Sequence, residues 1–172
     1  MNICCIYSTF PVGEVFSEPK DLERVNGSVV CWGFPNLDRI VETCVPFELQ
    51  IVQGRVVHIS HSAPKSFLDV MKVVEDGEGE LVIRELGIGL NKAMNKSNHV
   101  NDLTAFERQY GVHISVGKKH TVFKKAGMSR KASKARFHID LFLDVDTVVI
   151  DGKTVFSISS DSLTFFNQKS KQ

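Results

Sequence analysis

Two turn pairs that contain glycine, Gln53-Gly54 and Asp151-Gly152, most constrain how this chain can fold. Glycine adopts the positive φ angles that the tightest hairpin turns require, and β-branched residues favour extended strands. Each pair joins two short runs that contain apolar and β-branched residues, 46–52 with 56–59 and 147–150 with 154–156. The sequence therefore predicts two β-hairpins.

Further strands are expected wherever apolar residues cluster in short runs or alternate with polar ones. The run at 81–86 is predicted to break at Gly87-Ile88-Gly89, where two glycines permit a sharp turn. The other strands are expected at residues 2–7, 27–32, 112–116 and 137–142.

Two helices are predicted between these strands. An apolar residue recurs at positions i, i+3, i+4 and i+7 in Phe67, Val70, Met71 and Val74. This spacing predicts one buried face of a helix from about 64 to 76, with Ser66 as a possible cap. A second, shorter helix is expected to start at an Asp102 cap and to run to about Tyr110.

Length and composition indicate a single folded domain over residues 1–172. The chain is 42% hydrophobic and 24% charged, as in ordinary globular proteins, and is long enough for a real core. We see no repeat, linker or second domain. The expected fold class is α+β: mostly antiparallel strands in a barrel-like sheet, with two short helices.

Charge and cysteine content limit the function classes. A net charge of +1 provides no general attraction to nucleic acid or to a membrane surface, and no apolar run is long enough to span a bilayer. The N-terminus lacks a basic region before its apolar run, so it predicts a strand and not a signal peptide. Cys4, Cys5, Cys31 and Cys44 contain no C-x-x-C pair, which indicates reduced thiols in a cytoplasmic protein.

The strand predicted at 137–142 contains His138 and Asp140, two residues apart, so both side chains point to the same face. An imidazole beside a carboxylate on a rigid strand provides two of the ligands that a divalent metal ion needs. The same six residues also fit an ordinary half-buried strand with a solvated polar face.

Three other residues could complete such a site. Glu14 follows the Gly13 turn, Glu85 ends a predicted strand, and His113 lies on a strand that alternates cleanly. Each also has an ordinary interpretation, as a solvated turn residue, a strand end or a satisfied histidine.

The stretch from Lys118 to Arg136 contains eight basic residues and no acidic one. Such a run usually means a solvated loop. Directly before His138, it could instead bind an anion. Aromatic residues are sparse in it, which argues against nucleic-acid binding.

Taken together, these motifs resemble the metal-dependent aminopeptidase family that includes aminopeptidase T, aminopeptidase S and PepS. The resemblance covers residues from about 11 to 156. The matching motifs, in order, are Gly-Glu-Val-Phe with Glu14, Arg-Glu-Leu-Gly-Ile-Gly-Leu-Asn with Glu85, Val-His-Ile-Ser-Val-Gly with His113, His-Ile-Asp with His138 and Asp140, and the final Asp-Gly hairpin.

The resemblance implies a site for two divalent ions, zinc or cobalt first, with manganese or iron as alternatives. Glu14, His113, His138 and Asp140 would be ligands, and Asp140 would bridge the ions. Glu85 would be a ligand or the general base. A pair of ions can activate water and stabilise an oxyanion.

In the family, a catalytic tyrosine follows the first histidine motif, and the matching position here falls near His120. Glu85 and His120 are therefore the catalytic candidates that the resemblance implies. The substrate would be a peptide, and a precursor peptide of a biosynthetic pathway is the expected kind. Its carboxylate would be bound by four residues of the basic stretch: Lys118, Lys119, Arg130 and Lys131.

The family also has a large N-terminal domain to which nothing in this sequence corresponds. We therefore expect either a homodimer or a separate partner protein in place of that domain. Three functions stay open: a stand-alone metallopeptidase, a non-catalytic peptide-binding or partner-regulating module, and an iron-dependent oxygenase. In the third, His113, His138 and Asp140 would form a two-histidine, one-carboxylate triad, as the same superfamily includes an iron-dependent ring-cleaving dioxygenase.

Overall fold

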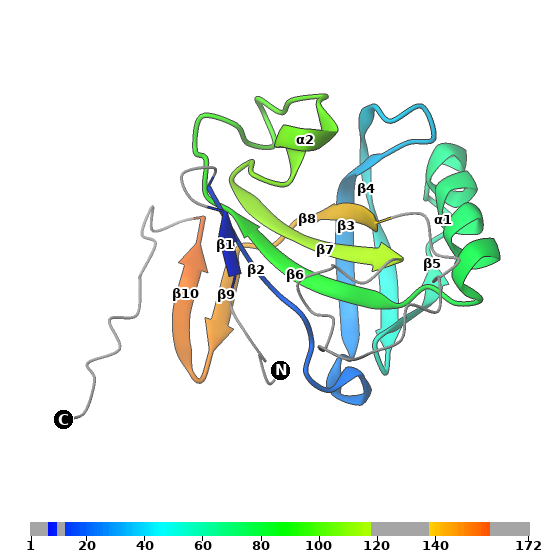
Figure 1. Cartoon of the computed structure of the whole chain (residues 1–172), viewed down its shortest axis with the longest axis horizontal. Helices are drawn as coiled ribbons and strands as arrows, with labels where there is room; N and C mark the ends of the chain where they lie inside the picture. The colour runs from blue at the N-terminus through cyan, green and yellow to red at the C-terminus, as the bar shows by residue number, and fades with distance from the viewer. Residues whose placement is uncertain (1–6, 10–12, 118–137, 159–172) are drawn as a thin grey trace, which may run out of the picture.

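The computed structural model describes residues 7–9, 13–117 and 138–158. Its main feature is one sheet in which all paired neighbours run antiparallel (Figure 1). The eight strands, in order across the sheet, are β1 (Tyr7–Thr9), β2 (Glu14–Ser17), β6 (Ile83–Gly89), β7 (Gly111–Gly117), β8 (His138–Leu143), β3 (Gly27–Pro35), β4 (Val41–Val52) and β5 (Arg55–Ile59).

The remaining elements flank this sheet. They are the 3₁₀ turn η1 (Leu22–Arg24), the helices α1 (Lys65–Glu78) and α2 (Leu103–Phe106), and the two-stranded pair β9 (Thr147–Ile150) and β10 (Lys153–Ser157). A single mixed domain dominated by antiparallel strands is thus confirmed. The expected barrel-like closure is not: within the described residues, β1 and β5 lie at opposite ends of the sheet and do not pair.

Both predicted hairpins form at their turn pairs. Gln53 and Gly54 have φ angles of 49° and 74°, and Asp151 and Gly152 have φ angles of 50° and 74°. Two successive positive φ angles twist the chain in the sense that joins adjacent antiparallel strands. A Cβ atom on Gly54 would also lie 2.7 Å from Leu22 Cδ2, so this position needs glycine for space as well.

Strand β6 does not break at its glycines, contrary to the sequence prediction. It runs to Gly89 because it is paired along both edges, with Gly87 opposite Phe16 of β2 and His113 of β7. Bonds from two neighbouring strands keep the backbone extended where local sequence would let it turn.

Helix α2 is shorter than predicted and ends at Phe106. The chain beyond it turns toward the 91–94 loop, where the Tyr110 N–H donates to the carbonyl oxygens of Asn91 and Met94. These tertiary bonds replace the helical bonds that a continuation to Tyr110 would have needed.

Helix α1 buries the predicted face, Phe67, Val70, Met71 and Val74. Its cap differs from the prediction. Pro64 takes the N-cap position without a side-chain bond, and Ser66 Oγ donates instead to Glu42 Oε1 on β4, at 2.6 Å. The helix ends two residues beyond the expected limit, where Gly79 adopts a left-handed φ of 83°.

Two described cysteines, Cys31 and Cys44, are free thiols, and Cys31 is fully buried. Burial raises the pKa of the Cys31 thiol well above its usual range, so this side chain is an inert core residue. Cys4 and Cys5, with most of the strand predicted at 2–7, lie outside the described residues. No helix in the described ranges is long and apolar enough to cross a membrane.

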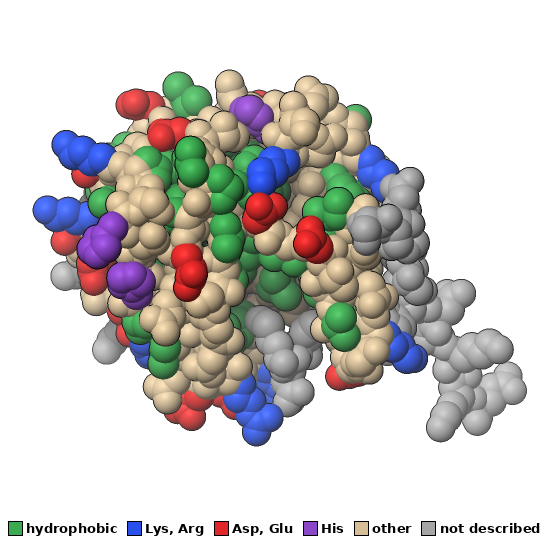
Figure 2. Space-filling model, turned by 180° about the vertical axis from the view of Figure 1, so that it is seen from behind, with side chains coloured by type: hydrophobic (Ala, Val, Ile, Leu, Met, Phe, Trp, Pro, Cys, Tyr) green, Lys and Arg blue, Asp and Glu red, His purple; other side chains and the backbone are tan. Residues whose placement is uncertain are grey.

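A hollow of about 320 Å³ lies between the sheet and the β9–β10 hairpin. Its lining is largely aliphatic and includes Leu86, Val112, Val145 and Val148. Figure 2, which views the molecule from the side opposite to Figure 1, shows hydrophobic side chains exposed on the floor of a hollow in this face.

The core of the domain depends on a ring cluster under α1. The Phe67 ring is fully buried and meets Phe34 and Phe47 edge to face, at 5.1 and 4.6 Å between centroids. We predict that Phe67→Ala lowers the free energy of unfolding by about 3–5 kcal/mol, because it removes a large buried side chain and leaves a cavity.

The measurement is urea denaturation followed by circular dichroism. The control is Leu68→Ala, one residue away on the same helix and 45% exposed, which is expected to cost less than about 1 kcal/mol. Equal effects of the two substitutions would contradict this account of the core.

Candidate metal centre

Three adjacent strands place polar side chains in one row. Glu85 of β6 is paired with Ser115 of β7, which is paired with Asp140 of β8. Directly opposite residues in antiparallel strands project to the same face of the sheet. Side chains separated by 55 positions in the sequence therefore become neighbours.

The next row contains Gly87, His113 and Phe142. The imidazole of His113 is fully buried and lies 5.3 Å from the Phe142 ring. A Cβ atom on Gly87 would lie only 2.0 Å from His113 Nε2. Glycine at this position therefore leaves the space that the imidazole occupies.

Glu14 enters from the neighbouring strand β2, where it is paired with Gly89 of β6. The preceding Gly13 has a φ of 90°, which lets the chain turn sharply into the strand. The Glu14 carboxylate is 3% exposed. A carboxylate this deeply buried needs a proton, a cation or hydrogen-bond donors to offset its lost hydration.

His138 and Asp140 project from β8 as the sequence predicts, with His138 Nε2 3.3 Å from Asp140 Oδ1. The intervening Ile139 and the following Leu141 are buried in the core. His138 is the more accessible of the pair, with its side chain 26% exposed. This edge of the site thus faces a surface that a small molecule can reach.

The five predicted ligands converge in two groups that share Glu85. Ligand atoms of Glu14, Glu85 and His113 lie within 4.8 Å of one another, as do those of Glu85, His138 and Asp140. Glu85, and not Asp140 as the resemblance implied, belongs to both groups. The structure thus brings the predicted residues close together, and their roles as metal ligands stay predictions.

The contacts around His113 favour a cation. Its Nε2 lies 3.0 Å from Glu14 Oε1 and 3.9 Å from Glu85 Oε1. Burial by itself lowers the pKa of His113, but the two adjacent carboxylates and the charge of Asp140 outweigh it and raise the pKa to about 10. A metal ion would supply the positive charge that a proton on this imidazole otherwise provides.

Several buried polar atoms in the centre make no hydrogen bond of good geometry within the described part of the chain, although two of them, His113 Nε2 and Glu14 Oε1, lie 3.0 Å apart. They are Glu14 Oε1, Glu85 Oε2, Ser115 Oγ and both His113 ring nitrogens. Buried polar groups without partners are rare in proteins, and a bound ion is one common reason for them. Carboxylate oxygens and imidazole nitrogens are also the donor types that divalent transition ions prefer. The residues therefore fit a metal ion.

Five predicted site residues cannot be placed. The catalytic candidate His120 and the substrate-binding candidates Lys118, Lys119, Arg130 and Lys131 all lie outside the described residues. Their roles stay predictions.

The structure adds residues that the sequence did not single out. Ser115 is fully buried between Glu85 and Asp140, and Gly87 makes room for His113. The alternation of β7 put Ser115 on the face of His113, which was a usable signal. The role of Gly87 depends on the β6–β7 register, which local sequence does not reveal.

Glu107, just after α2, is the third addition. Burial, followed by the negative charges of Glu14 and Asp140, raises the pKa of its carboxyl to about 7. The adjacent Arg108, whose guanidinium nitrogen Nη2 lies 3.5 Å from Glu107 Oε1, acts in the opposite direction without cancelling this. Glu107 thus extends the acidic surroundings of the centre.

Comparison with known proteins yields a structural relative only. Neither the protein-family models nor the curated proteins match this chain. Among solved structures, the fold is similar to that of 2,5-dihydroxypyridine dioxygenase from Pseudomonas putida KT2440, with a TM-score of 0.57 and 19% sequence identity. The match covers 83% of this chain and 41% of the dioxygenase chain, so this chain spans less than half of that protein.

This comparison corrects the functional prediction. The expected stand-alone metallopeptidase is contradicted, because a solved structure of similar fold is that of a dioxygenase and not of a peptidase. An aminopeptidase, or another peptidase or hydrolase, is therefore no longer the function inferred for this chain. The expectation of a metal site agrees with the two ligand groups on the sheet.

We predict that Gly87→Ala disrupts the centre, because the added methyl group must displace the His113 imidazole. Bound divalent metal, measured by elemental analysis after dialysis against zinc, is expected to fall at least about tenfold. The control is Gly77→Ala on α1, where a Cβ atom meets nothing within 4 Å. Metal retention by Gly87→Ala at the wild-type level would contradict the assigned packing.

Glu107→Gln should make the metal-free protein more stable at pH 8 than wild type, by about 1–2 kcal/mol, with little difference at pH 5. In the folded chain Glu107 keeps its proton up to about pH 7, whereas the unfolded chain loses it near its ordinary pKa. Wild-type stability therefore falls as pH rises between those two values.

The measurement is denaturant unfolding at both pH values. Glu48→Gln, an exposed substitution on β4, is the control and should show no such pH-dependent gain. A gain in stability for Glu107→Gln that is the same at pH 5 and pH 8 would show that the pKa of the Glu107 carboxyl is not raised in the folded chain.

Proposed function

We propose that this chain is a metal-dependent dioxygenase domain that binds one iron(II) ion and acts on a small aromatic ring compound. The observation that carries the proposal is the convergence of His113, His138, Asp140 and Glu85 on one face of a sheet whose fold resembles a dioxygenase. Two imidazoles and a carboxylate are the ligand set of non-haem iron(II) oxygenases.

Glu85 links the two histidines. His113 Nε2 and His138 Nε2 each lie 3.9 Å from the same atom, Glu85 Oε1. His138 Nε2 also lies 3.3 Å from Asp140 Oδ1, within the range of about 3–4 Å expected for two atoms that bind one ion at about 2.0–2.2 Å. His113 and His138 belong to different ligand groups, so a single ion bound by both would draw their side chains closer together.

When bound, an iron(II) ion would supply the one-electron chemistry that oxygen activation requires. The chain would orient the ligands, exclude water from the centre and supply negative charge around the ion. Its paired strands fix His113, His138 and Asp140 in direction, and the Phe142 ring shields His113 from water. The Glu14 and Glu85 carboxylates add negative charge that would stabilise the ion.

The test is anaerobic loading with iron(II), followed by measurement of iron content and oxygen consumption. We expect about one iron per chain. Oxygen uptake is expected with at least one of three ring compounds: 2,5-dihydroxypyridine, catechol and 2,5-dihydroxybenzoate. His138→Ala and Asp140→Ala should each lower both quantities at least about tenfold, because each removes a ligand.

His58→Ala, an exposed histidine on β5 outside the centre, serves as the control and should keep both properties. Iron-loaded protein that consumes no oxygen with any ring compound would overturn the proposed activity. Two iron ions per chain would overturn the single-ion centre.

A further inference from the structure

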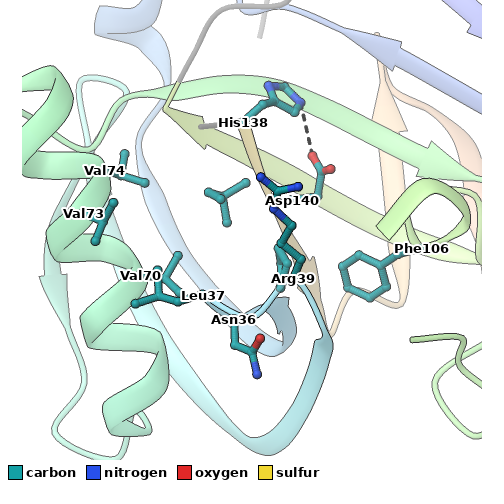
Figure 3. Close-up of a pocket in the computed structure, with 11 residues that line it drawn as sticks. Asn36, Leu37, Arg39, Val70, Val73, Val74, Phe106, His138 and Asp140 are labelled. Atoms are coloured by element: carbon teal, nitrogen blue, oxygen red, sulfur yellow. Dashed lines mark ion pairs between the residues drawn. The ribbon is translucent and has the colours of Figure 1, made fainter. Parts of the chain in front are cut away.

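A cavity of about 290 Å³ opens beside the metal centre, between α1, the turn that joins β3 to β4, and β8. His138 and Asp140 form part of its wall (Figure 3). Small-molecule sites in proteins are concave and reach this size at their lower limit. The cavity is thus suited to a molecule with a single ring.

Most of the remaining wall is apolar. Val70, Val73 and Val74 of α1 lie on one side, and Phe106 of α2 lies on another. Phe106 is held in place by Phe142, at 4.2 Å between ring centroids, so this wall is part of the core. Such surfaces favour the hydrocarbon part of a ligand.

One wall residue is a cation. Arg39 lies in the β3–β4 turn, and Figure 3 shows its side chain between Phe106 and Asp140. Its φ angle is 63°, a left-handed conformation that is unusual for a residue other than glycine. An arginine kept in an unfavourable conformation beside a site is an observation that suggests a role there.

The turn that holds Arg39 is firmly bonded. Asn36 Oδ1 accepts from the backbone N–H groups of Asp38 and Ile40, at 3.0 and 3.1 Å. The Arg39 N–H itself donates to the Asn36 carbonyl at 3.0 Å. These bonds fix where the Arg39 side chain leaves the backbone, at the edge of the cavity.

The guanidinium of Arg39 forms no ion pair with any carboxylate of the described residues. Other described arginines, such as Arg55 with Glu80 and Arg24 with Asp21, do have such partners. A guanidinium presents a planar fork of N–H donors that matches the two oxygens of a carboxylate. Arg39 is therefore available to bind an anionic group in the cavity.

We propose that this cavity binds the substrate of the metal centre, and that the substrate is an aromatic carboxylate whose anionic group is bound by Arg39. The inference rests on the proposed function in taking the bound molecule as the substrate. The ring would lie against Val73 and Phe106, with one edge toward His138 and Asp140. A divalent ion in the centre would offset the repulsion between the substrate and the ligand carboxylates.

Calorimetric titration of zinc-loaded protein with benzoate and with benzyl alcohol tests the inference, because zinc permits binding without redox turnover. Benzoate is expected to bind at least about tenfold more tightly than its uncharged analogue. Arg39→Gln should remove that difference, and Arg39→Lys should restore part of it. Arg24→Gln, an exposed arginine outside the cavity, should leave benzoate affinity unchanged.

Val73→Phe tests the role of the cavity independently of the charge on Arg39. Val73 is half-buried on α1, and the larger ring would occupy the cavity, so both probes should bind more weakly. Benzoate binding that Arg39→Gln does not change, or no benzoate binding to wild type at millimolar concentration, would overturn the inference. Neither result depends on oxygen uptake, so failure of the dioxygenase activity would be recognised separately in the iron-loaded protein.

Discussion

The arrangement of this domain depends on an electrostatic constraint: three ionisable side chains, Glu14, Glu85 and His113, are buried together on one face of a sheet. Two buried carboxylates repel one another and are costly to remove from water unless a positive charge lies between them. In the protein alone, a proton on His113 provides that charge. A metal ion would provide it more strongly, and would also engage His138 and Asp140.

Satisfying that constraint requires rigid strands. The candidate ligands come from β2, β6, β7 and β8, and hydrogen-bonded strands cannot shift by one residue without sending every side chain to the opposite face. The same rigidity brings Phe142 against both His113 and Phe106. The candidate metal centre and the wall of the neighbouring cavity therefore share one packed layer. A substitution that shifts side chains in one of them is expected to shift side chains in the other.

The similarity to a dioxygenase changed the functional interpretation while leaving the ligand residues in place. Carboxylates and imidazoles serve hydrolytic and oxidative metal centres alike, so residue type did not distinguish the two chemistries. Arg39 and the apolar cavity bear on that distinction in a different way. They indicate the shape and charge of the molecule that reaches the centre, which the ligands by themselves leave open.

The sequence alone determined the hairpins at Gln53-Gly54 and Asp151-Gly152 and the buried face of α1. These follow from local rules, namely turn geometry and side-chain periodicity, whereas the set of metal-ligand candidates came from the resemblance to a metallo-aminopeptidase family. Only the tertiary structure decided that β6 continues through Gly87, that Glu85 is shared by both ligand groups, and that Arg39 lines the cavity. The physical reason is that each of these depends on strand register or on contacts between segments far apart in the chain, and no local pattern encodes those distances.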